Sequence, residues 1–206
     1  MPENGEEKKM KKFLVLIVFA MIIIFALSCG NEKKSGGYEL ALITDVGTID
    51  DRSFNQGSWE GLKKYAEEKG ITHKYYQPTE KTTDAYIDSI DLAIAAGAKI
   101  VVTPGFLFEP AIYKAQDIHP EVNFVLLDGS PQDGNYQDFR IEKNVYSVFY
   151  AEEEAGFLAG YGAVKEGYTN LGFMGGMAVP AVVKFGYGFV QGVNYAAKEL
   201  GIRNVK

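Results

Sequence analysis

Four side chains of this 206-residue sequence have the chemistry needed to bind a planar, polar ligand. Asp45 and Asp128 each follow a short apolar run, and their carboxylates can accept hydrogen bonds from hydroxyl or N–H groups. Phe54 offers a ring that can stack on a planar ligand, and Asn55 beside it offers both a donor and an acceptor, as the edge of a heterocycle requires. Two alternatives stay open: Asp45 as a turn carboxylate that binds loop amides, and Phe54 as a core residue.

Two further acidic stretches have a simpler interpretation. Asp50 and Asp51 precede a stretch of helical period, and a carboxylate is favoured at a helix N-terminus by the free N–H groups and the helix dipole. The run of three glutamates at 152–154 predicts the first turn of another helix for the same reason.

The motifs of common enzymes and metal sites are missing from the sequence. One Cys and two His provide little material for a zinc site, and the segment 45–51 lacks the ligand spacing of an EF-hand. There is no G-x-S-x-G, no P-loop and no G-x-G-x-x-G motif. Gly156, Gly160 and Gly162 are expected within a helix, where small residues permit close packing. We therefore expect no catalytic residue, no metal site and no cofactor.

The composition indicates a globular protein that does not bind nucleic acid. A hydrophobic fraction of 47% with 23% charged residues excludes a disordered tail, a collagen-like repeat and a disulfide scaffold. The net charge of −6 gives no electrostatic reason to bind a polyanionic backbone.

The first 37 residues have the pattern of an export signal. Four lysines precede an apolar run at 13–27, which ends in Ser28 and Cys29, and this order of basic, apolar and small residues is typical of secretion. The run is shorter than the roughly 20 residues that a spanning helix needs, although a retained signal anchor stays an alternative. The segment resembles a bacterial lipobox, whose cysteine is lipidated and becomes the new N-terminus. We predict a signal peptide at 1–28, lipidation of Cys29, a flexible tether at 29–37, and a location at the cell membrane facing the periplasm or the exterior.

The remaining chain alternates strand-like and helical patterns, which predicts a parallel, doubly wound α/β sheet. Apolar runs that suit buried strands occur at 39–44, 72–76, 99–103, 123–127, 144–149 and 170–174. Apolar stripes at helical spacing occur at 59–66, 85–96 and 110–117. Ligands of such sheets bind beyond the carboxyl ends of the strands, which is where Asp45, Phe54, Asn55 and Asp128 are expected.

Three segments together resemble the basic-membrane-protein (BMP) family of PnrA-like lipoproteins. They are DVGTIDDRSFNQ at 45–56, NVYSVFYAEEEAGFLAG at 144–160, and GFMGGM at 172–177 followed by Pro180 and FGYGFVQG at 185–192. Characterised members of this family are purine-nucleoside-binding components of ABC importers. The resemblance extends over nearly all of residues 38–206.

The resemblance implies a type I periplasmic-binding-protein fold, in which a hinge joins two α/β lobes. We expect an N-terminal lobe at 38–146, and a hinge with an incomplete second lobe at 147–206. Family members are much longer, so the resemblance also implies a truncated second lobe, with further ligand-binding residues beyond position 206.

The resemblance also implies the ligand and the partners. Phe54 would stack on the purine of inosine, guanosine or adenosine, Asn55 would bind its edge, and Asp45 and Asp128 would bind donors of the base or ribose. An ABC permease and its ATPase would be the protein partners, and the lipid on Cys29 would hold the protein at the membrane. Two other functions stay open: a nucleoside-hydrolysing enzyme, and a surface lipoprotein with an adhesive or interaction role.

Overall fold

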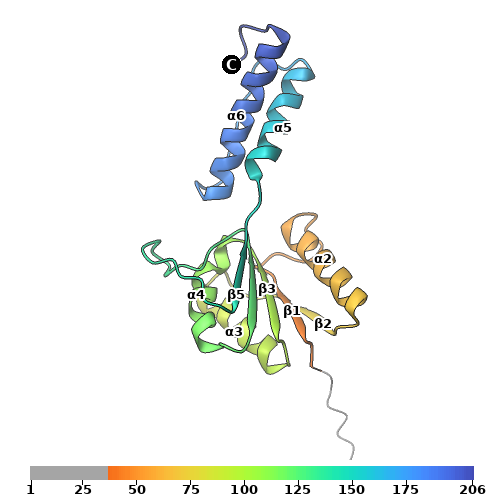
Figure 1. Ribbon diagram of the computed structural model, residues 1–206, viewed down its shortest axis with the longest axis vertical. Helices are drawn as coiled ribbons and strands as arrows, with labels where there is room; N and C mark the ends of the chain where they lie inside the picture. Colours follow the sequence, from red (N-terminus) through yellow and green to blue (C-terminus); the bar gives the residue numbers. More distant parts are fainter. Residues whose placement is uncertain (1–36) are drawn as a thin grey trace, which may run out of the picture. The chain divides into compact units, whose positions relative to one another are not determined.

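The computed structural model describes residues 37–206, and residues from Tyr38 onward form one compact unit. Its parallel sheet has the strand order β2-β1-β3-β4-β5, which confirms the predicted parallel, doubly wound arrangement (Figure 1). The strands are β1 (Leu40–Ile43), β2 (His73–Tyr76), β3 (Ile100–Pro104), β4 (Asn123–Leu127) and β5 (Val145–Val148). The helices are α2 (Phe54–Lys69), α3 (Thr83–Ala95), α4 (Glu109–Ile118), α5 (Glu152–Lys165) and α6 (Pro180–Leu200), with a 3-10 helix η1 (Phe106–Phe108) before α4.

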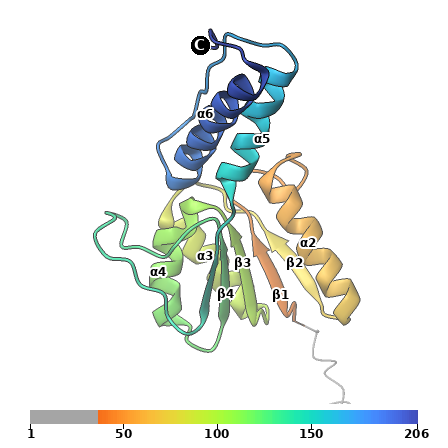
Figure 2. The same ribbon diagram turned by 45° about the horizontal axis from the view of Figure 1, so that its top comes forward.

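The sheet is covered on both faces, and the side chains of the inner strand β1 alternate between two apolar cores. In β1, Leu40 and Leu42 pack in the cluster that includes the α2 residue Leu62. Ala41 and Ile43 point the other way, into the larger cluster built with α3 and α4. Figures 1 and 2 show α2 on one side of the sheet and α3 and α4 on the other. All four residues of β1 are buried, which explains why its sequence is a continuous apolar run.

Local signals in the sequence fix the ends of the first helices. Gly70 ends α2 in the left-handed conformation, at φ 66°, where glycine avoids the clash of a Cβ atom. Thr82 begins α3, and its side chain accepts a hydrogen bond from the backbone N of Ala85 at 3.2 Å. Both ends of α3 lie within two residues of the predicted stretch 85–96, whereas α2 begins five residues before the predicted stretch 59–66.

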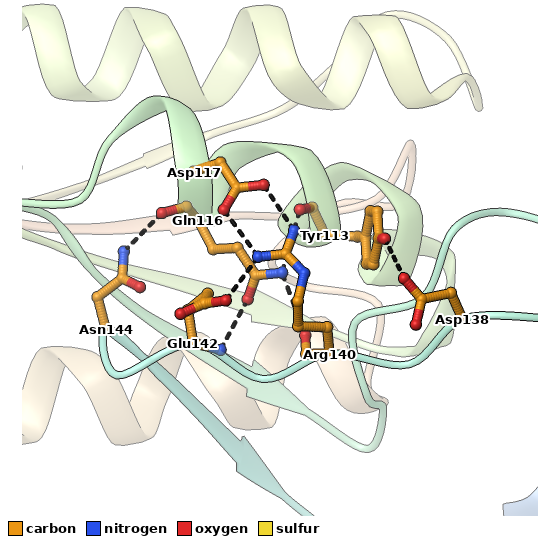
Figure 3. Close-up of polar contacts among 7 residues, drawn as sticks. All are labelled: Tyr113, Gln116, Asp117, Asp138, Arg140, Glu142 and Asn144. Carbon is orange, nitrogen blue, oxygen red and sulfur yellow. Dashed lines mark hydrogen bonds and ion pairs between the residues drawn. The ribbon is translucent and has the colours of Figure 1, made fainter.

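An ion-pair network attaches the long connection between β4 and β5 to α4 (Figure 3). The Arg140 guanidinium donates to both carboxylate oxygens of Asp117, at 2.8 and 2.6 Å, and to Glu142 at 2.6 Å. The Tyr113 hydroxyl donates to Asp138, and the Arg140 guanidinium lies 4.9 Å from the Tyr113 ring centroid. A bidentate pair of this kind fixes both the distance and the orientation of the segment.

Two buried amides continue the network toward β5. Gln116 donates to the carbonyl of Arg140 and accepts from the backbone N of Glu142 (Figure 3). Asn144 donates to three backbone carbonyls around the end of α4, those of Gln116, His119 and Val122. These contacts place β5 at the edge of the sheet.

Helices α5 and α6 pack against each other through glycines, as the sequence predicts for Gly156 and Gly160. A Cβ atom at these two positions would lie 2.2 and 2.1 Å from backbone carbonyl oxygens of α6. Gly188 and Gly192 of α6 meet carbonyl oxygens of α5 in the same way, at 2.0 Å. Gly162 has open space around its Cβ position, so close packing does not explain it.

The prediction of a strand at 170–174 is wrong for this structure. Thr169 and Leu171 each share one backbone hydrogen bond with Lys206, in the pattern of a single parallel bridge. A strand requires a continuous ladder with a neighbour, and the described part of this segment has only these two backbone hydrogen bonds to Lys206. The segment is irregular and leads into α6.

The predicted segments before residue 37 and the predicted boundary between the two lobes remain predictions. The signal peptide at 1–28, Cys29 and nearly all of the tether lie outside the described residues. β5 extends across the expected boundary between 146 and 147, and that boundary stays a prediction. Across residues 37–206, no helix combines the length and the apolar character that crossing a bilayer requires.

Candidate functional site

A cavity of about 1040 Å³ runs from the face of the sheet beside α2 to the carboxyl ends of the strands. Its floor is apolar and includes Val102, Val125 and Leu127 of β3 and β4. Ser58 and Tyr65 line it along α2, and six more polar or aromatic side chains line its carboxyl end: Ser53, Phe54, Asp128, Tyr150, Glu152 and Phe185. In a parallel sheet this end is where ligands bind, so we take it as the candidate site.

Phe54 presents an aromatic ring to this cavity. It is the first residue of α2 and its side chain is 38% exposed, so it is not a core residue. Its ring and that of Tyr150 have a T-shaped arrangement, with the ring centroids 6.2 Å apart and an interplanar angle of 79°. Gly105 has a φ of 104°, which a side chain rarely adopts, and a Cβ atom there would lie 3.9 Å from the Phe54 ring. The Phe54 ring is thus partly exposed at the cavity.

Asp45 and Asn55 bind each other beside the cavity and are not among its lining residues. The Asn55 side-chain amide donates to Asp45 Oδ1 at 2.8 Å, and the backbone N of Gly47 donates to the same oxygen at 2.7 Å. A Cβ atom on Gly47 would lie 2.7 Å from both partners, so this pair requires glycine there. Asp45 therefore does bind a loop amide, and its predicted role toward a ligand stays a prediction.

Asp51 is the carboxylate at the start of α2. It accepts hydrogen bonds from the backbone N–H groups of Ser53, Asn55 and Gln56 at 2.8, 3.3 and 3.1 Å. Desolvation raises the pKa of Asp51, but the three donors together outweigh it, and the net result is a lowered pKa. This contact holds Phe54 and Asn55 at the first turn of the helix.

Asp128 follows β4 and has a strained backbone. Its φ is 56°, in the left-handed region that few residues other than glycine adopt, and its N–H donates to the carbonyl of Val148 at 2.7 Å. Burial and then the neighbouring Glu152 carboxyl raise the pKa of Asp128 to about 6. Its carboxyl is therefore able to change protonation close to neutral pH.

A buried glutamate, Glu109, holds the loop after Asp128 by hydrogen bonds. Glu109, at the start of α4, accepts from the backbone N of Ser130 at 3.0 Å and from the Gln132 amide at 3.2 Å. Burial raises the pKa of Glu109. A Cβ atom on Gly129 would lie 3.1 Å from the Glu109 side chain, so the loop and the glutamate are in close contact.

Glu152 is the first residue of α5, and its side chain is only 4% exposed. Its Oε2 pairs with the Lys184 ammonium at 3.1 Å, while its Oε1 is buried without a hydrogen-bond partner. Burial opposes ionisation of Glu152, but hydrogen bonds from its own backbone N–H, from Lys184 and from the Asp128 carboxyl outweigh burial, so the pKa of Glu152 is lowered.

The structure brings two of the four predicted ligand residues, Phe54 and Asp128, to one cavity. Sequence reasoning missed Tyr150, Glu152 and Phe185 as lining residues. The first two follow β5 directly, so applying the carboxyl-end rule to this last strand would have found them. No group of three or more His, Cys, Asp or Glu side chains within 37–206 is placed to hold a metal ion.

Comparisons with known proteins agree on the family. The model of the family described as "Bmp: ABC transporter substrate-binding protein PnrA-like" matches residues 38–205. The ABC transporter nucleoside-binding protein BmpA of Lactococcus lactis subsp. cremoris is 30% identical, with 93% of this chain and 56% of the relative covered. Basic membrane protein A1 of Borrelia garinii subsp. bavariensis is 31% identical, with 94% and 55% covered. The chain spans about half the length of these curated relatives.

Solved structures support the same fold. An ABC transporter solute-binding protein from Aeropyrum pernix K1 superposes with a TM-score of 0.64 at 25% identity, covering 79% of this chain and 44% of that one. The arabinose-binding protein AraP of Geobacillus stearothermophilus shares the fold at 14% identity, with a TM-score of 0.54 and coverages of 76% and 51%. These likenesses confirm the periplasmic-binding-protein fold, and this chain spans about half the length of the two solved chains. The chain belongs to the Bmp family of PnrA-like ABC transporter substrate-binding proteins.

Proposed function

We propose that this chain binds purine nucleosides as the solute-binding component of an ABC importer. The observation that carries this proposal is the cavity at the carboxyl end of the sheet, which both the exposed Phe54 ring and Asp128 line. An aromatic platform with hydrogen-bonding groups at its edge suits a purine, because every base has a stackable face. The name of the Lactococcus lactis relative, a nucleoside-binding protein, supports the same ligand class.

The proposal assigns a role to each predicted residue. Phe54 stacks on the base and Asp128 binds a donor of the base or ribose. Asn55 and Asp45, which bind each other in the structure, support the part of the site next to Phe54. When the ligand binds, they exchange this hydrogen bond for hydrogen bonds to the edge of the base. The permease and ATPase are proposed partners, and lipidation of Cys29 is the proposed attachment to the membrane surface.

Equilibrium dialysis of the chain against radiolabelled guanosine, inosine and adenosine tests this function, with uridine and free ribose as matched controls. We expect saturable binding of the purine nucleosides and weaker binding of the controls. Chromatography of the bound fraction after long incubation should recover intact nucleoside. Release of free base would favour the nucleoside-hydrolysing alternative, and no saturable binding would contradict the proposal.

A further inference from the structure

Glu152 carries a feature that its role at the start of α5 leaves unexplained. An acidic first turn needs only exposed carboxylates near the helix end, and Glu153 and Glu154 supply them. The Glu152 side chain is instead 4% exposed and lines the cavity. Only one of its oxygens has a partner in the described residues.

A buried carboxylate oxygen without a partner is costly. A charge-bearing acceptor that loses its water hydrogen bonds must regain them from protein or ligand, or the folded state is destabilised. The Lys184 ammonium, at 3.1 Å, pairs with Oε2 and compensates the charge, and the neighbouring Asp128 carboxyl can donate to Glu152 only while it carries a proton. Once Asp128 is ionised, Oε1 is an acceptor without a donor in the described residues. The first turn of α5 also favours the ionised form.

We propose that Glu152 is a further ligand-binding residue, whose Oε1 accepts a hydrogen bond from an O–H or N–H donor of the bound nucleoside. The inference rests on the proposed function and adds a second carboxylate to the site. Glu152 lies on α5, whereas Phe54 begins α2 and Asp128 follows β4, so the ligand is bound from three separate elements. Lys184 acts as a positioning residue, because it holds the carboxylate without lining the cavity.

Isothermal titration of guanosine into the full chain tests the role of Glu152, with Glu152→Gln as the variant and Glu154→Gln as the control. The control removes an exposed carboxylate from the same helical turn. Because the amide retains the shape but not the charge, we expect Glu152→Gln to raise Kd about tenfold, as the loss of a charge-assisted hydrogen bond implies. Glu154→Gln should leave Kd unchanged.

Ligand analogues identify the donor. The 2′-deoxy, 3′-deoxy and 5′-deoxy forms of guanosine each lack one ribose hydroxyl, whereas inosine and 1-methylguanosine each lack a donor of the base. We expect one of these analogues to bind the unsubstituted chain about tenfold more weakly than guanosine does. The same analogue should bind the Glu152→Gln variant no more weakly than it binds the unsubstituted chain. A ribose analogue in that position assigns the contact to the sugar, and a base analogue assigns it to the purine.

Three outcomes would overturn the inference. Equal guanosine affinity for Glu152→Gln and the unsubstituted chain would show that Oε1 makes no contact. If the loss of affinity from Glu152→Gln simply adds to the loss from every analogue, Glu152 acts only through the fold. No nucleoside binding by the unsubstituted chain would instead remove the proposed function itself, and the inference with it. If Glu152→Gln fails to fold by circular dichroism, Glu152→Asp keeps the charge, withdraws the oxygen by one methylene, and should give the same analogue pattern.

Discussion

At the scale of single residues, the candidate site combines an exposed ring with carboxyls that differ in protonation. Phe54 is exposed because it begins a helix just past the edge of the sheet, where no core neighbour covers it. Asp128 and Glu152 line the same cavity, yet burial raises the pKa of Asp128 to about 6, and Lys184 helps to keep that of Glu152 low. One acid is therefore able to donate or accept near neutral pH, and the other only accepts.

Replacement of Phe54 by Ala tests the stacking platform. Loss of base stacking should weaken guanosine binding by ~1–3 kcal/mol, while Phe54→Tyr should have a small effect because it keeps the ring. Titration calorimetry measures the affinity, and thermal unfolding provides the control for the fold. A large drop in Tm with unchanged affinity would mean that the ring serves the core.

Replacement of Asp128 by Asn tests the raised pKa. As the pH falls, Asp128 binds a proton at a pKa of about 6 in the folded state, but only near the ordinary value of 3.8 in the unfolded chain. The contribution of Asp128 to the free energy of unfolding is therefore fully present below about pH 3.8 and is lost as the pH rises through about 6. At pH 7.5 the ionised Asp128 beside Glu152 destabilises the fold, and Asn removes that charge while tolerating a positive φ. We expect Asp128→Asn to raise Tm at pH 7.5 and to raise it much less at pH 4.5. The same gain in Tm at both pH values would show that the pKa of Asp128 is not raised.

The sequence predicts the residues of this site better than their contacts. Asp45, Phe54, Asn55 and Asp128 all lie near the carboxyl end of the sheet, because β–α turns follow from the alternation of apolar runs. That Asn55 donates to Asp45 depends on side-chain rotamers within one loop, which no spacing rule specifies. The position of Glu152 after β5 could have been predicted by the carboxyl-end rule, but its burial could not, since its sequence neighbours are exposed glutamates.

At the scale of elements, the strands and helices of the sheet follow the local pattern closely. The predicted run 123–127 coincides with β4, and the run 99–103 differs from β3 by one residue at each end. The segment 170–174 has a similar apolar pattern but is no strand, because strand formation depends on a neighbouring strand as well as on the segment's own residues. Pairing partners far along the chain are not encoded in a local window.

The glycine contact between α5 and α6 gives a matched pair of variants. Gly160→Ala places a methyl group 2.1 Å from a backbone oxygen of α6, so the helices must separate, and we expect a loss of about 1–3 kcal/mol or more in the free energy of unfolding. Gly162→Ala meets open space in the same helix and should stabilise it by about 0.5–1 kcal/mol. Urea unfolding followed by circular dichroism measures both. Equal effects of the two variants would contradict the close packing.

At the scale of the whole molecule, family membership is established for a chain about half the length of its curated relatives. The described residues form a five-stranded parallel sheet and a helix pair with a separate apolar core around Val164, Val193 and Ala196.

Replacement of Cys29 by Ser tests the proposed membrane attachment. Cys29 is the one cysteine of the sequence and follows the apolar run of the predicted signal peptide. Its loss should abolish incorporation of radiolabelled palmitate in bacterial cells and release the protein or leave it as the precursor. Unchanged labelling of Cys29→Ser would contradict lipidation at this position.

The measurement that tests the central claim most directly is a titration of the ¹⁵N-labelled chain with guanosine, followed by amide chemical shifts up to millimolar ligand. We predict saturable shifts at the carboxyl end of the sheet, in the turns that carry Phe54, Asp128 and Glu152, with little change at the opposite end of the strands. Uridine at the same concentrations should shift these amides less. The absence of saturable shifts, or shifts confined to residues away from this cavity, would contradict a purine-nucleoside site there.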